Sequence, residues 1–470
     1  MRVLFIYPQA PTTLQESGFP LGVGYLSSIL NGNGHKTSLL VLDSFNELKV
    51  SGKIKKFKPN LIAITSTSDQ IILSKKFVDF IYKKFKLPII LGGIHATVAP
   101  EECVNILGVT GICRGEGEYA MLEFADALGK NKEFTGIRNF WFKKNGKIIK
   151  NYLRPLIRNL DSLPFPNRRL MNYQRLLDAR KDRDAEFMAS RGCPYTCSYC
   201  INHTYKKMYA NNGKFLRFRS ADNVIAEIKE VISRYNVKII TFHDDTFTLN
   251  RAWLKRFCES YKKEINKPFF CNSRPDTLDE ENIRLLKSAG CIKINIGIES
   301  GNDVIRNKIL ERHINEREII KSFGLCNKYG IKTLAFNMIG LPYETEENIK
   351  ETIRLNKKVK PSIIFASIFR PYPGTKLFRL CKKNKWISKR KVKSYFENTS
   401  ILNLPSISNK KIKYYHDVFR WLIFKPFISY YLIILFAKIN IKNKSLYRII
   451  FPFVRKIYFF TYRLKNKSWG

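Results

Sequence analysis

Short apolar runs alternate with amphipathic stretches over the first 130 residues. The stretches repeat about every 3.6 residues and predict helices at about residues 19–31, 70–86, 97–107 and 116–129. The apolar runs predict β-strands at about residues 2–7, 37–42, 60–65, 87–91 and 109–113. Strands that alternate with helices form parallel sheets. We therefore expect an α/β fold that begins with a doubly wound five-stranded parallel sheet over residues 1–135, with a ligand at the carboxyl ends of its strands.

The same alternation returns in the second half of the chain. Apolar runs predict strands near residues 186–191, 238–243, 268–273, 291–298, 331–339 and 362–369, and helical patterns separate them. Six such units predict a partial (β/α)6 barrel of the TIM type over residues 186–400, with its chemistry at the carboxyl ends of the strands. Residues 136–185 connect the two domains and begin with a predicted hairpin at 137–152 that turns at Asn145 and Gly146.

The last 70 residues, 401–470, have a different pattern. They contain 14 Lys or Arg against one acidic residue, Asp417, and mix aromatic side chains with flanking cations. The longest uncharged run, Pro426 to Ala437, is too short to span a bilayer. The pattern favours a basic, aromatic, helical tail that lies in a membrane interface, and it is equally compatible with helices that pack on the barrel or on another subunit.

Composition narrows the class of protein. A chain of 470 residues is longer than a domain with one hydrophobic core usually is, so more than one domain is expected. The content of 44% hydrophobic and 13% aromatic residues excludes a disordered protein. The chain opens on the apolar strand MRVLFIYPQ without a charged leader, which predicts a cytoplasmic protein, or one peripheral at the inner membrane face. Ten cysteines then indicate a reducing compartment, and those outside the one cluster are expected to be small buried hydrophobes.

The net charge of +44 has several readings. It fits an anionic membrane, a negatively charged substrate, nucleic acid, or a compositional drift toward Lys, Asn and Ile. Lysine is spread through nearly every predicted helix, as on a solvated face, and no zinc-finger or RNA-recognition pattern accompanies it. We therefore expect no nucleic-acid partner.

Three cysteines are clustered in RGCPYTCSYCINH, residues 191–203, just after the first barrel strand. A structural zinc site would need a fourth ligand beside Cys193, Cys197 and Cys200, and His203 is the nearby candidate. Three thiolates can instead hold three irons of a 4Fe-4S cluster and leave the fourth iron open. Because an electron-transfer cluster normally has four cysteines, the open iron implies that another molecule binds there.

The spacing CxxxCxxC, with Tyr199 before the last cysteine, resembles the signature of the radical S-adenosylmethionine (SAM) enzymes. In that family SAM chelates the open iron, and its reductive cleavage yields methionine and a 5′-deoxyadenosyl radical. The segments GGIHATVAPEE, RGEGE, LPFPNRR, DDTFTLNR and RPYPGTKLF resemble the subgroup with an N-terminal cobalamin-binding domain. The resemblance covers about residues 1–400 and implies a 4Fe-4S cluster, SAM and cobalamin as cofactors.

The resemblance also assigns cofactor contacts to strand ends. It implies a cation for the methionine carboxylate, a carboxylate near the ribose or amino group, further polar contacts to the amino group, and backbone contacts to adenine. The implied SAM residues are Tyr199, His243, Asp244, Asp245, Arg274, Glu299, Ile339 and Gly340. In the N-terminal domain a flat cofactor is expected over Thr65, Ser66, Gly92, Gly93 and Glu116. No residue is singled out as catalytic.

One departure from the cobalamin-binding pattern concerns histidine. Members with a His ligand to cobalt carry Asp-x-His-x-x-Gly, and no His in this chain has Asp two residues before it. Ligation of cobalt by His is therefore not implied. His35 and His95 are expected to be structural.

The leading hypothesis is an enzyme that methylates an unactivated carbon of a small-molecule or lipid-like substrate, supplied with electrons by a reductant such as ferredoxin or flavodoxin. A radical cyclase, or another rearrangement as in anaerobic tetrapyrrole ring formation, is the alternative. A methylthiotransferase acting on transfer RNA is disfavoured, because only Cys103 and Cys113 precede the motif where its second cluster needs three cysteines. A non-catalytic metal or corrin binder, or a membrane-surface scaffold, is the hypothesis from another class.

Overall fold

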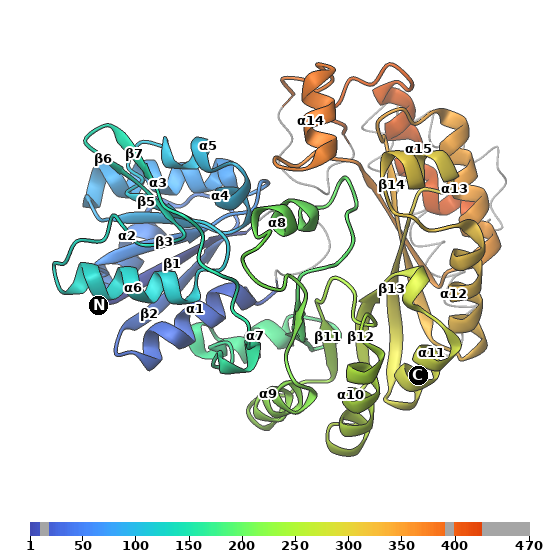
Figure 1. The fold of residues 1–470 in the computed structure, drawn as a ribbon, viewed down its shortest axis with the longest axis horizontal. Helices are drawn as coiled ribbons and strands as arrows, with labels where there is room; N and C mark the ends of the chain where they lie inside the picture. Colours follow the sequence, from blue (N-terminus) through green and yellow to red (C-terminus); the bar gives the residue numbers. More distant parts are fainter. Residues whose placement is uncertain (10–17, 391–398, 425–470) are drawn as a thin grey trace.

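The computed structural model describes residues 1–9, 18–390 and 399–424. The N-terminal domain, blue to cyan in Figure 1, lies beside the barrel domain, green to orange, and α8 lies between them. Residues 425–470, and with them the uncharged run Pro426 to Ala437, fall outside the described residues.

The N-terminal sheet has the strand order β2-β1-β3-β4-β5-β6-β7. The five parallel strands are β1 Arg2–Pro8, β2 Lys36–Leu42, β3 Leu61–Thr65, β4 Ile89–Gly92 and β5 Gly111–Cys113. They confirm the predicted five-stranded parallel sheet. The predicted hairpin also forms, as β6 Phe140–Lys144 and β7 Lys147–Lys150, and β6 pairs antiparallel with β5. The hairpin thus extends this sheet beyond residue 135, where the first domain was predicted to end.

Helices cover both faces of the N-terminal sheet. They are α1 Leu21–Gly32, α2 Glu47–Phe57, α3 Ile71–Phe85, α4 Ile94–Val98, α5 Pro100–Val104 and α6 Glu118–Gly129. Successive residues of β1 alternate between two cores, with Val3 and Phe5 against α1 and α6, and Leu4 and Ile6 against α2 and α3. This alternation is what makes the sheet doubly wound.

Two details of these helices differ from the prediction. Helix α2 was not predicted, because only Val50 and Ile54 form its buried apolar face within a lysine-rich stretch. The single helix predicted at 97–107 is two short helices that meet at Ala99, with Pro100 in the first position of the second.

The second domain is built on a parallel six-stranded sheet of order β15-β14-β13-β12-β11-β8. Its strands are β8 Asp184–Phe187, β11 Ile239–Phe242, β12 Phe269–Ser273, β13 Cys291–Glu299, β14 Lys332–Ile339 and β15 Ile363–Ile368. They confirm the partial barrel. The predicted strand at 186–191 is interrupted, because β9 Ser190–Arg191 leaves the barrel and pairs antiparallel with β10 Arg217–Phe218.

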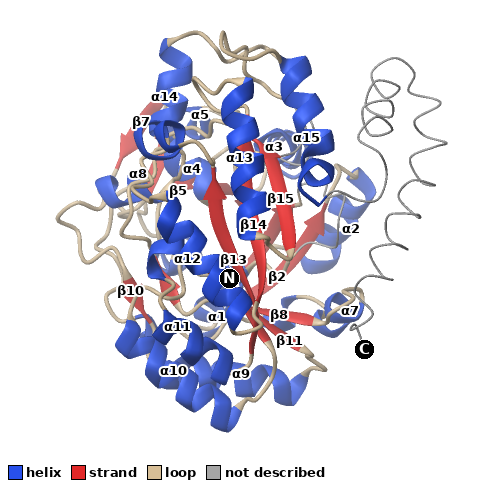
Figure 2. Ribbon diagram, turned by 90° about the vertical axis from the view of Figure 1, so that its right-hand side faces the viewer, coloured by secondary structure: helices blue, strands red, loops and turns tan. Residues whose placement is uncertain are grey.

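Helices cover the outer side of the barrel strands (Figure 2). The α-helices are α7 Tyr173–Asp178, α8 Asn202–Met208, α9 Ala221–Arg234, α10 Arg251–Glu264, α11 Glu280–Ser288, α12 Glu316–Lys328, α13 Glu346–Val359, α14 Lys376–Lys383 and α15 Asn409–Phe424. The 3₁₀ turns are Leu160–Ser162, Arg168–Leu170 and Pro275–Thr277, and a π-turn spans Ile305–Ile309. Side-chain caps such as Asn250, Asp279 and Asn315 begin several of these helices.

The described part of the predicted tail packs on the barrel. Ile412 and Phe419 of α15 are fully buried in the core formed with β14, β15 and α13. For this segment the structure bears out the packing alternative rather than an interfacial helix. Among the residues that the structure describes, no helix is both long and apolar enough to cross a bilayer.

Ion pairs fasten the two domains at both edges of the barrel. At the β8 edge, Arg191 reaches Glu116 at 3.0 Å and Glu118 at 2.6 Å. At the β15 edge, Arg370 pairs with Asp69 at 2.5 Å, and the Tyr372 hydroxyl donates to the same carboxylate at 3.0 Å. Tyr372 therefore also joins the two domains.

Candidate active site

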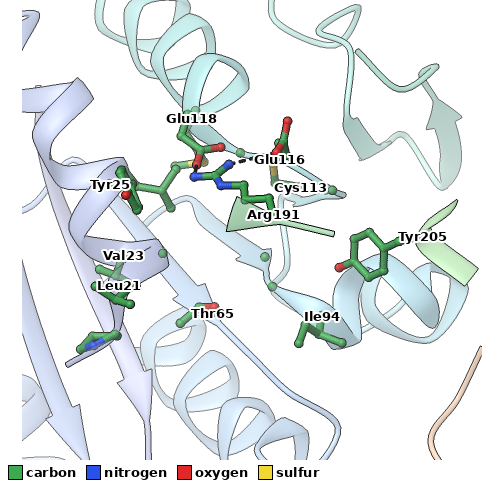
Figure 3. A pocket seen from close by; sticks show the side chains of 18 of the residues that line it. Leu21, Val23, Tyr25, Thr65, Ile94, Cys113, Glu116, Glu118, Arg191 and Tyr205 are labelled. Carbon is green, nitrogen blue, oxygen red and sulfur yellow. Dashed lines mark hydrogen bonds and ion pairs between the residues drawn. The ribbon is translucent and has the colours of Figure 1, made fainter. Parts of the chain in front are cut away.

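A cavity of about 570 Å³ lies between the two domains, at the carboxyl ends of both parallel sheets (Figure 3). Its N-terminal-domain wall includes Phe5, Tyr25, Ala63, Thr65, Ile90, Gly92, Gly93, Cys113 and Glu116. Its barrel wall includes Met188, Arg191, Gly192, Ile201, Asn202, Tyr205, Tyr209 and Asp245. The cavity therefore connects the loops of the N-terminal domain with the segment that carries the three cysteines.

Two glycines at the end of β4 keep the N-terminal wall of the cavity open. Gly93 has φ +88°, and a Cβ placed there would lie 2.7 Å from Thr65 Oγ1 and 2.9 Å from the backbone of Ser66. The loop is held by a hydrogen bond from the Ser66 N–H to the Gly92 carbonyl at 2.9 Å. Thr65, Gly92 and Gly93 line the cavity as predicted, whereas Ser66 does not, because its hydroxyl is buried against Ser74 at 3.1 Å.

The part of the N-terminal wall that the sheet strands form is apolar. Phe5, Ala63, Ile90 and Cys113 belong to the sheet itself and are almost completely buried. Burial raises the pKa of the Cys113 thiol to about 12, so this thiol stays neutral. The wall suits a flat, largely apolar group inserted toward the sheet.

Glu116 lines the cavity, but its carboxylate is occupied. It accepts from Arg191 at 3.0 Å, from Arg217 at 3.0 Å and from the Ile157 N–H at 2.8 Å. Burial by itself raises the pKa of Glu116, but the two guanidinium groups and the N–H outweigh burial and hold the pKa below its ordinary value. Glu116 thus fastens the domains, and its carboxylate has little capacity left for a ligand.

The cysteine segment begins at a backbone turn that requires glycine. Gly192 has φ +88°, and a Cβ there would lie 2.5 Å from the Phe215 carbonyl oxygen. Cys193 and Cys197 are buried, and Cys200 is half-buried. Burial is the main reason that the pKa of the Cys200 thiol is raised to about 12; a hydrogen bond from the Asn202 N–H lowers it, and the nearby Asp245, Cys197 and Cys193 add to the rise. Thiols buried in this way become stable thiolates only with a cationic centre beside them.

The arrangement fits a multi-iron cluster better than a single zinc ion. Within the described ranges, no three His, Cys, Asp or Glu side chains converge so as to hold one metal ion. His203 is not part of such a group: its Nδ1 donates to the Cys200 carbonyl at 2.6 Å, and its Nε2 lies 3.3 Å from Thr204 Oγ1. A 4Fe-4S cluster spreads its thiolates over separate irons and does not need that convergence.

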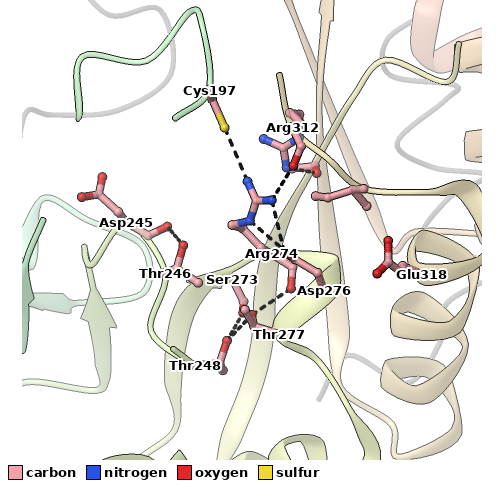
Figure 4. Close-up of polar contacts among 12 residues, drawn as sticks. Cys197, Asp245, Thr246, Thr248, Ser273, Arg274, Asp276, Thr277, Arg312 and Glu318 are labelled. Atoms are coloured by element: carbon pink, nitrogen blue, oxygen red, sulfur yellow. Dashed lines mark hydrogen bonds and ion pairs between the residues drawn. The ribbon is translucent and has the colours of Figure 1, made fainter. Parts of the chain in front are cut away.

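Arg274 at the end of β12 lies directly beside the cysteines (Figure 4). Its Nη1 is 3.5 Å from Cys197 Sγ, and its guanidinium lies 3.4 Å from the centre of the Tyr195 ring. Nε contacts Asp276 at 3.0 Å, and Nη2 donates to the Arg312 carbonyl at 2.8 Å. These contacts hold a buried cation next to the thiol of Cys197.

A second buried group of polar side chains surrounds Glu299 at the end of β13. Arg312 donates to the Tyr199 hydroxyl at 2.5 Å and lies 3.5 Å from Glu299 Oε1, which is 3.4 Å from the same hydroxyl. Burial raises the pKa of Glu299, and Arg312 opposes this only in part. Tyr199 and Glu299 are thus brought together as predicted. Arg312 was missed, because its loop carries no recognisable pattern.

The three polar residues that follow β11, His243, Asp244 and Asp245, lie in different surroundings. Asp244 is buried, accepts from the Ala189 N–H at 3.0 Å and from the Ser190 hydroxyl, and has a pKa raised to about 6 by burial. His243 lies 3.4 Å from Glu186. Of the three predicted contacts only Asp245 lines the cavity, so Asp244 is a structural residue in this geometry.

The end of β14 forms a tight turn at Gly340, which has φ +76°. The N–H groups of Gly340 and Leu341 donate to Glu344 at 2.6 and 3.2 Å. Glu344 is fully buried, and burial raises its pKa to about 8. The Ile339 side chain is buried in the core, so the turn exposes the backbone of this residue rather than its side chain. The role of Glu344 in holding this turn was not predicted from the sequence. Its position four residues after Gly340 could have suggested it.

The predictions for the other histidines and cysteines agree with the structure. His95 is buried against Ser68 at 3.0 Å and Glu102 at 3.4 Å, and His35 contacts Asp126 at 3.1 Å. Both are structural. The cysteines outside the cluster are all buried: Cys103, Cys113, Cys258, Cys271, Cys291, Cys326 and Cys381.

Two family models match the two domains. Residues 12–125 match the B12 binding domain, and residues 188–355 match the radical SAM superfamily. The chain is 30% identical to an uncharacterised methyltransferase of Pyrococcus horikoshii over 92% of this chain and 93% of that one. The chain belongs to the cobalamin-dependent radical SAM methyltransferases. The resemblance described from its motifs is thereby confirmed.

Further comparisons agree with this family. The chain is 25% identical to the anaerobic magnesium-protoporphyrin IX monomethyl ester cyclase of Rubrivivax gelatinosus over 81% of this chain and 70% of that one. The structure of the radical SAM methyltransferase TsrM from Kitasatospora setae, with cobalamin and a [4Fe-4S] cluster bound, superposes with a TM-score of 0.68 at 17% identity and covers 88% of this chain and 84% of that one. The protein is an enzyme with a 4Fe-4S cluster, SAM and cobalamin as cofactors, as predicted.

Proposed function

We propose that this cobalamin-dependent radical SAM enzyme transfers a methyl group from SAM to a carbon atom of a small-molecule or lipid-like substrate. The observation that carries the proposal is the cavity at the carboxyl ends of both sheets, because it brings the loops of the B12-binding domain next to the cysteine segment. Bound together, the cofactors supply a carbon radical and a transferable methyl group.

The proposed cluster ligands are Cys193, Cys197 and Cys200. Arg274, which lies 3.5 Å from the Cys197 sulfur, would bind the carboxylate of the methionine moiety. Asp245, on the cavity wall, would accept a hydrogen bond from its amino group. These roles follow from charge: a buried guanidinium attracts a carboxylate, and a carboxylate attracts an ammonium group.

Further contacts to SAM are proposed from the strand ends beyond Arg274. Glu299, fixed by Tyr199 and Arg312, would accept from the ribose hydroxyl groups. Ile339 and Gly340 would present backbone groups to adenine, in the turn that Glu344 holds. Arg312 is a positioning residue here, because it acts through Glu299.

Cobalamin would be held mainly by the N-terminal wall. Thr65, Gly92 and Gly93 offer an open backbone surface, and the apolar sheet residues around Ala63 offer a slot for a flat group. No histidine lines the described part of the cavity, so the proposal includes no histidine ligand to cobalt.

The substrate is proposed to enter the barrel lumen beside strands β12 and β13. Asn272 and Asn295 on neighbouring strands are half-buried and joined by a hydrogen bond of 2.9 Å. The Oδ1 of Asn295 is buried without a hydrogen-bond partner among the described residues. An unpaired acceptor there suits a substrate that carries an N–H or O–H donor.

A proposed reductant and a proposed membrane contact complete the functional assignment. Electrons would come from a protein such as ferredoxin or flavodoxin in the cytoplasm, and residues 425–470 would contact the inner membrane face. Truncation after Phe424 tests the membrane contact and is preferable to truncation at Ser400, because α15 belongs to the barrel core. Loss of co-sedimentation with anionic liposomes is expected, and unchanged co-sedimentation would exclude this segment as the anchor.

The decisive experiment is anaerobic reconstitution with SAM that carries a deuterated methyl group. The expected result is about four irons and one corrinoid per chain, 5′-deoxyadenosine that depends on the reductant, and a product heavier by one labelled methyl in place of hydrogen. A product that has lost hydrogens or gained oxygen, without label, would overturn methylation in favour of the cyclase reaction.

A further inference from the structure

A second pocket lies on the outer side of the N-terminal domain. It has a volume of about 510 Å³ and is lined by Arg114, Arg138, Trp141, Lys150, Asn151, Tyr152, Leu153, Met208 and Asn212. We call it the outer pocket. The loop after β5 and helix α8 separate it from the main cavity, since Gly115 and Tyr205 of these segments line that cavity.

The lining of the outer pocket is basic. Three cationic side chains, Arg114, Arg138 and Lys150, face it, and no carboxylate lines it. Lys150 lies 3.4 Å from Glu101, but in the described parts of the chain Arg114 and Arg138 form no ion pair. The positive charge of the pocket is therefore largely uncompensated, which favours an anionic ligand.

An indole ring organises two of these cations. The Arg114 guanidinium and the Lys150 ammonium each lie 4.5 Å from the centre of the Trp141 ring. Trp141 is only 7% exposed, and its Nε1 and the Nε of Arg114 are buried without partners in the described ranges. Buried N–H donors without partners are rare in folded proteins, and they indicate a site that is complete only with an acceptor bound nearby.

The rim of the pocket carries an exposed aromatic ring. Tyr152 is 87% exposed, although it follows β7 directly and lies among cations. An exposed tyrosine beside arginines can stack on a planar group while the guanidinium groups hold phosphate oxygens.

We propose that the outer pocket binds a phosphate-bearing small molecule, with Arg114 and Arg138 on the phosphate and Tyr152 against its organic ring. Guanidinium groups bind phosphate oxygens in pairs of hydrogen bonds, and the pocket is large enough for a nucleotide-sized ligand. The proposal is independent of the methyl transfer, because none of these side chains lines the main cavity.

The test is calorimetric titration of the reconstituted holoenzyme with inorganic pyrophosphate and, separately, with adenosine 5′-monophosphate. We expect saturable binding of one ligand per chain. Arg114→Gln and Arg138→Gln should each weaken binding of both ligands about tenfold or more. Tyr152→Ala should weaken only the nucleotide. Arg138 and Tyr152 are exposed, so their variants test the proposal even if Arg114→Gln fails to fold.

The matched control is Lys147→Gln, which removes one charge from the same hairpin without touching the pocket. It should leave both affinities unchanged. Absence of saturable binding up to about 10 mM would overturn the proposal, since such affinity is weaker than a built site provides. Equal weakening by Lys147→Gln would also overturn it, because diffuse positive charge would then explain the binding. Tighter binding of an RNA oligonucleotide, weakened equally by all charge variants, would assign the surface to nucleic acid instead.

Discussion

Glu344 is a buried carboxyl whose partners are two backbone N–H groups of the turn at Gly340. Burial raises its pKa from 4.5 to about 8, so around neutral pH the group is mostly protonated. The second oxygen, Oε1, has no partner among the described residues. The turn at the end of β14 therefore depends on a neutral acid.

This pKa predicts how stability changes with pH. A carboxyl whose pKa is higher in the folded than in the unfolded chain binds a proton on folding, so its contribution is complete below about 4.5 and is lost as the pH rises through about 8. Glu344→Gln keeps an acceptor and removes the proton. At pH 8.5 it should raise the free energy of unfolding by about 1–3 kcal/mol relative to its effect at pH 5.5.

Urea unfolding at both pH values measures this difference. Glu259→Gln, on the exposed side of α10, is the control and should give the same change at both pH values. A Glu344→Gln effect that does not depend on pH would show that the buried group is ionised throughout.

The cysteines of the CxxxCxxC motif and the other buried cysteines are expected to differ in their role. Cys197→Ala removes one thiolate of the proposed cluster site, so iron content and reductant-dependent 5′-deoxyadenosine should both fall to background. Cys326→Ala in α12 removes an equally buried thiol that has only a packing role, and should cost about 1 kcal/mol of stability with no loss of iron. Retention of four irons by Cys197→Ala would contradict the assignment.

At the scale of elements, the loop between β4 and α4 determines how closely a cofactor approaches the sheet. Gly93 adopts φ +88°, and its neighbours Thr65 and Ser66 leave no room for a side chain. A side chain at Gly93 would displace the loop, and Gly92 and Gly93 present backbone to the cavity. The loop acts through its shape rather than through a charged group.

Gly93→Ala tests this role of the loop. The left-handed backbone and the contact with Ser66 should together cost about 1–3 kcal/mol, and the displaced loop should reduce corrinoid content well below one per chain. Gly324→Ala in α12 is the matched control, because nothing lies within 4 Å of its added Cβ, and it should stabilise the helix by about 0.5–1 kcal/mol. Absorbance of the corrin and thermal unfolding provide the two measurements. Full corrinoid loading of Gly93→Ala would contradict the proposed cradle.

At the scale of the molecule, the two domains are held together by partly buried ion pairs on both sides of the cavity. Arg191 joins the cysteine segment to Glu116 and Glu118, and Arg370 joins the last barrel strand to Asp69. Arg191 lies two residues before Cys193, so the same contact that joins the domains also positions the proposed cluster ligands relative to the proposed cobalamin wall.

Arg191→Gln should loosen this interface. Glu118 loses its ion-pair partner, whereas Glu116 keeps Arg217, so the cost should be about 1.5–3 kcal/mol. 5′-Deoxyadenosine should then form with less methylated product for each equivalent of deoxyadenosine. Arg234→Gln breaks an exposed pair with Glu230 and should change stability by about 0.5 kcal/mol or less. A ratio of product to deoxyadenosine that stays constant in Arg191→Gln would show that the ion pair is structural only.

The amino-acid pattern alone was sufficient for much of this protein. Short apolar runs and period-3.6 patterns located both sheets, because strands buried on two faces must be continuously apolar. The spacing of Cys193, Cys197 and Cys200 indicated the cluster, since three thiols on one short segment are a local property of the chain. Helix α2 was not located, because its buried apolar residues, Val50 and Ile54, give a weak signal in a lysine-rich stretch.

Contacts between distant segments needed the folded structure. Whether Asp244 or Asp245 faces the cavity depends on where Ala189 and Ser190 lie, 54 or more residues earlier in the chain. The partners of Glu116 come from Arg191 and Arg217, and Arg312 reaches Glu299 from a loop without a motif. Local patterns record what each element buries, whereas hydrogen bonds across the domain interface depend on how the elements meet, and no short stretch of sequence encodes that.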